Sequence, residues 1–120
     1  MQYMFLIYHS PDSEPTYGSP EFQAMMQGFA AFNKQAAADG VLRAGEGLKG
    51  VETATSLRVR GGKVETMDGP FAETREHLGG FYLLELPDLD TALRYAAQIP
   101  VAHFGTIEVR PVMDYDLPEH

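Results

Sequence analysis

Residues 2–8 read QYMFLIY, a short run in which nearly every side chain is apolar or aromatic. Turn-forming residues follow at positions 10–15, so the run predicts a β-strand that is buried on both faces of a sheet. Residues 81–86 read FYLLEL and have the same character. The sheet should therefore need a cover on each of its two faces.

Two amphipathic helices are expected, one in the first half of the chain and one in the second half. Ser19 can cap a helix that begins at Pro20, and apolar residues then recur at helical spacing until Gly40 ends the helix. Asp88 can cap a second helix that continues through Gln98. Each helix has one apolar stripe, which we expect to face the core.

The remaining strands complete the expected order of elements. Residues 41–48 and 106–113 predict two strands, and residues 56–60 and 63–67 alternate in character around the two glycines at 61–62, as is typical of a β-hairpin. The order is then strand, helix, strand, hairpin, strand, helix, strand. This order indicates the α+β class, with a ferredoxin-like antiparallel sheet and two helices on one face.

The second face of that sheet is expected to be covered by another copy of the chain. Two helices can cover only one face, and a second copy is the economical cover for the other. We therefore expect a homodimer in which two sheets pack face to face.

Composition narrows the class of protein. A chain of 120 residues fits a single domain, residues 1–120. Seventeen acidic residues against nine basic ones give a net charge of −8, which disfavours nucleic acid as a partner. No cysteine is present, so disulfides and thiolate metal sites are excluded. The first residues lack the features of a signal peptide, and no apolar run approaches the ~20 residues that span a bilayer. We expect a cytoplasmic protein with no membrane partner.

Residues 68–82 read DGPFAETREHLGGFY and gather the densest set of reactive groups in the chain. Three carboxylates, one guanidinium and one imidazole lie between a Gly-Pro corner and a Gly-Gly pair, which we expect to be the hinge of a loop. Glycine and proline fix the course of such a segment, and loops held by a rigid scaffold often carry function. This segment is therefore the predicted place for chemistry, at the rim of a cleft.

The same segment resembles the signature of the YCII-related, or DGPF, family. DGPF stands at residues 68–71, AETRE at 72–76 and LGGF at 78–81, and the resemblance continues through YMFLIY at 3–8 and GTIEVRPV at 105–112. It implies a dimeric α+β barrel with a cleft between helices, sheet and partner. It implies much less about a reaction, although the wider group includes a dehydrohalogenating enzyme of chlorinated aromatic breakdown.

Four residues are candidates for catalysis. Asp68 could act as a general base if burial raised its pKa, although Asp before Gly-Pro is also typical of a turn. Glu73 and Arg75 could clamp an anionic or carbonyl-bearing ligand, or they could form a solvated ion pair. His9, at the end of the first strand, could face a cleft or belong to the turn. Arg75 stands where the family commonly has Lys, which excludes a Schiff base there.

Five residues are candidates for ligand binding. The aromatic side chains of Tyr8, Phe71 and Tyr82 would line a pocket. Glu76 would belong to the clamp, and Arg110, before a proline at a strand end, could present its guanidinium to a bound acid. Cross-strand charge pairing would explain Arg110 equally well.

Neither a metal nor a cofactor is expected. His77 lies four residues after Glu73, but one His and one Glu fall short of a three-ligand metal site, and no nucleotide-binding motif is present. Three functions stay open: a cofactor-independent lyase, dehydrohalogenase or isomerase that uses a carboxylate or His for acid–base chemistry; a non-catalytic, small-metabolite-binding or regulatory dimer; and a structural dimer braced by the loop.

Overall fold

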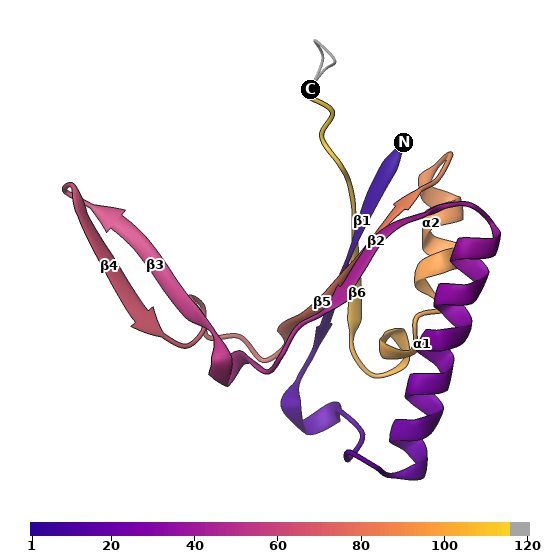
Figure 1. Ribbon diagram of the computed structural model, residues 1–120, viewed down its shortest axis with the longest axis horizontal. Coiled ribbons are helices and arrows are strands. Elements are labelled where there is room, and N and C mark those ends of the chain that lie inside the picture. The colour runs from indigo at the N-terminus through magenta and orange to yellow at the C-terminus, as the bar shows by residue number, and fades with distance from the viewer. Residues whose placement is uncertain (116–120) are drawn as a thin grey trace.

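A four-stranded antiparallel sheet is the centre of the computed structural model, which describes residues 1–115 (Figure 1). The strands lie in the order β2 (Leu42–Gly47), β5 (His77–Glu85), β1 (Gln2–His9) and β6 (Thr106–Pro111). Both doubly apolar segments of the sequence, in β1 and β5, thus occupy the middle of the sheet. Their side chains are the ones that need cover on both faces.

Helices α1 (Pro20–Ala38) and α2 (Leu89–Ala96) follow β1 and β5 in the chain. The Ser19 hydroxyl accepts a hydrogen bond from the Phe22 amide at 3.1 Å, so α1 begins at the predicted cap. The Asp88 carboxylate caps α2 in the same way through the Thr91 amide at 2.8 Å. Short 3-10 turns precede α1 and follow β2 and α2, at Pro11–Ser13, Val51–Thr53 and Pro100–His103.

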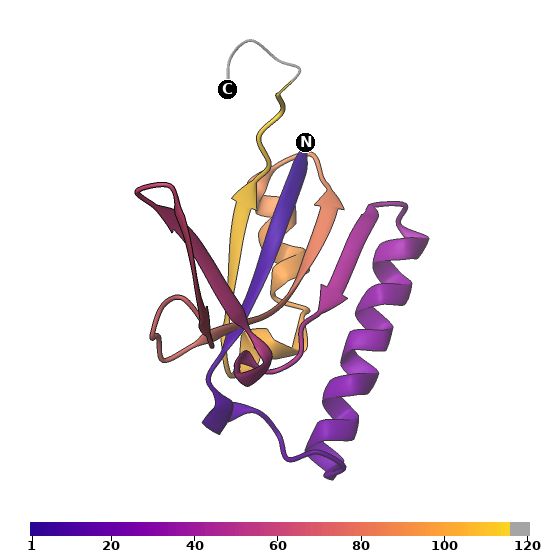
Figure 2. The same cartoon turned by 60° about the vertical axis from the view of Figure 1, so that its left-hand side comes forward.

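Both helices pack on the same face of the sheet. Alternate residues of β1 and β5 form one buried cluster with Phe32 of α1 and Ala92 of α2, and Phe5 and Leu84 at its centre are 0% exposed. Figure 2 shows α2 behind the central strands and α1 alongside β2. The α+β class, the antiparallel sheet and the two helices on one face are therefore confirmed.

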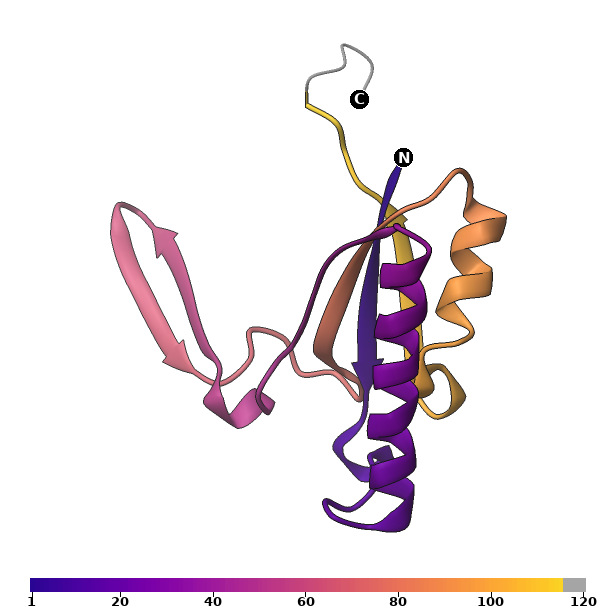
Figure 3. The ribbon, with the colours of Figure 1, turned by 45° about the vertical axis from the view of Figure 1, so that its right-hand side comes forward.

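The predicted hairpin is confirmed, but it forms a sheet of its own. Strands β3 (Thr55–Arg60) and β4 (Lys63–Asp68) pair with each other, and Gly61 and Gly62 turn the chain with positive φ angles of 58° and 77°. The hairpin projects away from the helix-covered body (Figures 1 and 3). Its apolar side chains, Leu57 among them, are largely exposed.

The glycine pair before Phe81 lies in a strand and is not the expected hinge of a loop. Strand β5 begins at His77, and Gly80 pairs with Ile7 on one side and Gly47 on the other. A Cβ atom on Gly80 would lie 2.7 Å from the carbonyl oxygen of Glu46, closer than real Cβ atoms approach. Glycine here serves close strand packing.

In the described part of the chain, residues 1–115, no helix has the length and apolar character that a membrane crossing requires.

We expect Leu84→Ala to lower the free energy of unfolding by about 2–5 kcal/mol, because it leaves a cavity between sheet and helices. Leu57→Ala removes the same atoms from a side chain that is 63% exposed, and it should cost less than about 0.5 kcal/mol. Urea denaturation at one protein concentration measures both. Equal losses would contradict the placement of the core.

Candidate functional site

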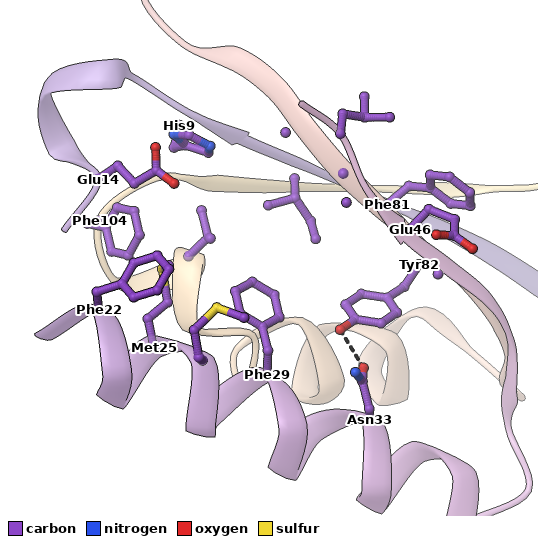
Figure 4. Close-up of a pocket in the computed structure, with 18 of the residues that line it drawn as sticks. His9, Glu14, Phe22, Met25, Phe29, Asn33, Glu46, Phe81, Tyr82 and Phe104 are labelled. Atoms are coloured by element: carbon purple, nitrogen blue, oxygen red, sulfur yellow. Dashed lines mark hydrogen bonds between the residues drawn. The ribbon is translucent and has the colours of Figure 1, made fainter. Parts of the chain in front are cut away.

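A cavity of about 580 Å³ opens between α1 and the end of the sheet where β1 finishes and β5 begins (Figure 4). Cavities of this size and position are typical small-molecule sites. The walls are mostly apolar, and the side chains that form them include Phe22, Met25, Phe29, Leu42, Val101 and Phe104.

Glycines of β2 and β5 provide the room for this cavity. A Cβ atom on Gly45 would lie 2.6 Å from the Tyr82 ring, and one on Gly79 would lie 2.7 Å from Nε2 of His9. A Cβ atom on Gly47 would meet nothing within 4 Å, because it would stand in the open cavity. The missing side chains thus leave space for two aromatic rings and for a ligand beside them.

His9 and Glu14 form one polar end of the cavity (Figure 4). The Nδ1 atom of His9 lies 3.3 Å from the carbonyl oxygen of Ser10. A carbonyl oxygen only accepts hydrogen bonds, so in the tautomer that makes this contact a hydrogen bond the proton is on Nδ1 and Nε2 carries a lone pair. Glu14 is exposed and has no hydrogen bond or ion pair with any other residue in the range 1–115.

Tyr82 and Asn33 form the other polar end. The Tyr82 hydroxyl donates a hydrogen bond of 2.5 Å to Oδ1 of Asn33. Burial raises the pKa of Tyr82 above its ordinary value, so the phenol stays protonated at neutral pH and remains a donor. Nδ2 of Asn33 makes no hydrogen bond within residues 1–115, so its hydrogens can donate to another molecule.

Glu46 and Phe81 also border the cavity, but their side chains belong to the opposite face of the sheet. The two residues are partners in the β2–β5 ladder, one position away from the Gly45–Tyr82 pair that faces α1. Successive side chains in a strand point to opposite faces. Figure 4 shows both side chains directed away from Phe22 and Phe29.

Two of the predicted site residues, His9 and Tyr82, line this cavity. Tyr8 lies on β1 at a half-buried position. Arg110 is the partner of Met4 in the β1–β6 ladder and so belongs to the face away from the helices.

The predicted loop residues lie outside the cavity. Asp68, Glu73 and Arg75 are exposed, and Glu76 is half-buried where β5 is about to begin. Phe71 is 74% exposed and borders a smaller hollow of about 130 Å³ on the hairpin. Their roles in catalysis and binding stay predictions.

The Asp-Gly-Pro corner is braced as a turn against β3. The Gly69 amide donates to the carbonyl oxygen of Ala54 at 2.7 Å, and the Ser56 hydroxyl donates to the Gly69 carbonyl at 2.9 Å. Gly69 has a φ of 95°, which favours glycine. These contacts support the turn interpretation of the segment after Asp68.

Two polar residues of the cavity, Glu14 and Asn33, were not among the predicted site residues. Asn33 follows Phe29 by four residues, so it interrupts the apolar face of α1, and that interruption is a signal visible in the sequence. Glu14 lies in a turn-forming segment and gives no such signal. Within residues 1–115, no group of three or more His, Asp or Glu side chains is placed to hold a metal ion.

Comparison with known proteins supports the sequence resemblance. The family model for the YCII-related domain matches residues 1–116, which include every element of the sheet and both helices. The chain belongs to the YCII-related family. An uncharacterised protein of Rhizobium meliloti (strain 1021) is 34% identical to this YCII-related chain over 117 residues, which is 96% of this chain and 94% of the relative.

In this YCII-related protein we expect Gly79→Ala to displace the His9 ring, since the new methyl group would lie 2.7 Å from Nε2. The imidazole end is flexible, so leaving its rotamer should cost only about 1 kcal/mol of stability. NMR signals of the His9 ring should shift. Gly47→Ala, which meets open space, is the matched control and should leave these signals in place. Unchanged His9 signals in Gly79→Ala would contradict this geometry.

Proposed function

We propose that this YCII-related protein binds a small organic molecule in the cavity between α1 and the glycine-lined end of the sheet. We further propose that it moves a proton on that molecule without a cofactor, as a lyase, dehydrohalogenase or isomerase does. The observation that carries the proposal is one apolar cavity with His9 at one polar end and the Tyr82–Asn33 pair at the other.

His9 is the proposed proton acceptor. Its Nε2 takes a proton from a carbon atom of the bound molecule, and the electron pair of the broken C–H bond enters a new double bond. In a dehydrohalogenation the bond between the neighbouring carbon and the halogen breaks, and the halide ion leaves with the electron pair of that bond. In an isomerisation the charge moves onto a carbonyl oxygen, to which Asn33 donates through Nδ2, and the proton then returns to a different carbon. Glu14, at the same end of the cavity as His9, carries the negative charge that stabilises the imidazolium.

The loop residues give the competing assignment. Asp68, Glu73 and Arg75 are exposed in the single chain, so they could act on a bound molecule only if a second copy set this loop over a cavity. A base in contact with solvent would also lack the desolvation that tunes a carboxylate toward neutral pH. This comparison favours His9 over Asp68.

Binding without catalysis is the second candidate function. No hydrogen bond or ion pair joins His9 directly to Glu14 in the described structure, whereas an activated base is usually oriented by a hydrogen-bonded partner. A cavity used only to sense a small metabolite needs no such pair.

A homodimer is part of the proposal. The sheet face away from the helices carries a partly exposed apolar patch of Met4, Leu6, Phe81 and Leu83. Glu46 on β2 and Arg110 on β6 share this face at opposite edges. A two-fold axis parallel to the strands would lay β2 of one copy over β6 of the other and cover the apolar patches of both copies.

The cavity assignment can be tested with a thermal-shift screen of phenols, aryl ketones and β-chlorinated aryl ketones, followed by NMR of each hit in D2O. A ligand at 100 times its Kd should stabilise the protein by about 2.7 kcal/mol. Gly47→Leu should abolish this stabilisation by filling the cavity, whereas Lys49→Leu, which adds the same side chain beyond the strand, should preserve it. Hits that bind Gly47→Leu equally well would refute the site.

Catalysis by His9 predicts a second result in the same assay. For a hit that exchanges hydrogen for deuterium or loses halide, His9→Asn should lower the rate by about 100-fold or more, the scale of a lost general base. Asp68→Asn should retain most of the rate. The reverse pattern would assign the chemistry to the loop, and stabilisation with no exchange or product for any hit would favour the binding module.

For the homodimer, we expect light scattering to give a mass twice that of the chain. Leu6→Glu should reduce it to the mass of one chain, because a carboxylate would be buried without a partner in the middle of the apolar patch. Leu93→Glu is the control, because Leu93 is 49% exposed on α2, on the other side of the sheet. A wild-type monomer would remove this part of the proposal.

A further inference from the structure

The charge of the cavity lining restricts the ligand. The ionisable side chains that face the cavity are His9, Glu14 and Tyr82, and no Lys or Arg is among its lining residues. With Tyr82 protonated, the fixed charge is the single negative charge of Glu14. An anionic ligand would therefore enter without any permanent cation to pair with.

The surroundings of Glu14 suit a cation. In Figure 4 its carboxylate lies at the same end of the cavity as His9, and the aromatic rings of Phe22 and Phe104 line this cavity too. Glu14 has no ionic partner in the described chain, so its charge is available to a ligand. An ammonium group gains from a carboxylate and from the faces of aromatic rings together.

The opposite end suits a neutral polar group. Asn33 offers amide hydrogens, and the Tyr82 hydroxyl offers lone pairs while its proton is held by Asn33. Neither side chain carries a charge. Between the two ends, Met25 and Phe29 present apolar surface, which an aromatic ring would cover.

We infer that the ligand of this cavity is a cationic amine: a flat apolar or aromatic body with an ammonium group that meets Glu14 and a hydroxyl or carbonyl group that meets Asn33. This inference rests on the proposed function, since it names the ligand class for the same cavity. It departs from the sequence-based expectation of an arginine clamp for acids, because Arg75 and Arg110 do not line the cavity.

Three probes with one ring and different charges test this inference. Tyramine is cationic, 4-hydroxyphenylacetate is anionic and 4-ethylphenol is neutral, and all three carry the same phenol. Isothermal titration calorimetry should give tyramine a Kd at least about tenfold lower than that of 4-hydroxyphenylacetate, which corresponds to ~1.4 kcal/mol. Added salt should weaken tyramine binding more than 4-ethylphenol binding.

Glu14→Gln should bring the affinity for tyramine down to that for 4-ethylphenol and leave 4-ethylphenol binding unchanged. Glu21→Gln removes the same charge from an exposed residue of α1 that does not line the cavity, so it should keep the preference for tyramine. Loss of the preference in both variants would assign it to the net charge of the protein and would overturn the role of Glu14.

The two proposals fail in different ways. Binding of all three probes with equal affinity, or tighter binding of 4-hydroxyphenylacetate, overturns the cationic ligand and leaves the cavity as a binding site. Binding of none of the probes overturns the inferred ligand class, whereas the small-molecule site is overturned when the thermal-shift screen gives no hit or Gly47→Leu binds the hits equally well.

Discussion

The pairing of β1 with β5 is the constraint on which the other features depend. It sets Phe5 opposite Tyr82 on the helix side and Leu6 opposite Phe81 on the other side. One face therefore builds the core, and the other retains an apolar patch. The register of this pair shifts between Ile7 and Tyr8, beside the end of the sheet where the cavity opens. Core, patch and cavity thus follow from one strand pair.

Local sequence patterns are enough to predict the elements and their order, because helix caps, apolar periodicity and turn glycines act over a few residues. They do not tell a glycine in a turn from one in a crowded strand. Gly61 needs its positive φ, while Gly80 is needed because the Glu46 carbonyl lies close. The second reason is a contact between strands far apart in the chain, so local patterns cannot supply it.

Local sequence patterns predict the candidate site less well than they predict the fold. Clustering along the chain favours residues 68–82, where reactive side chains are neighbours in sequence. The cavity gathers residues that are dispersed: His9 from β1, Asn33 from α1 and Tyr82 from β5. The sequence predicts His9 and Tyr82 as site residues, because each lies in or at the end of an expected strand and has a side chain that can bind or transfer a proton. Glu14 becomes relevant only when the fold carries the segment after β1 across the cavity mouth.

The proposed ligand charge and the proposed homodimer bear on each other. The net charge of −8 creates a field that attracts cations over the whole surface, and Glu14 gives that attraction a local focus at the cavity. A permanent positive charge at the mouth of the cavity would reverse the proposed preference for cationic ligands. The exposed Arg75 could supply that charge if a second copy of the chain placed its loop at the mouth. A preference for amines in the native assembly therefore argues that dimerisation leaves Arg75 away from the cavity, with the DGPF segment acting as a turn that supports the hairpin.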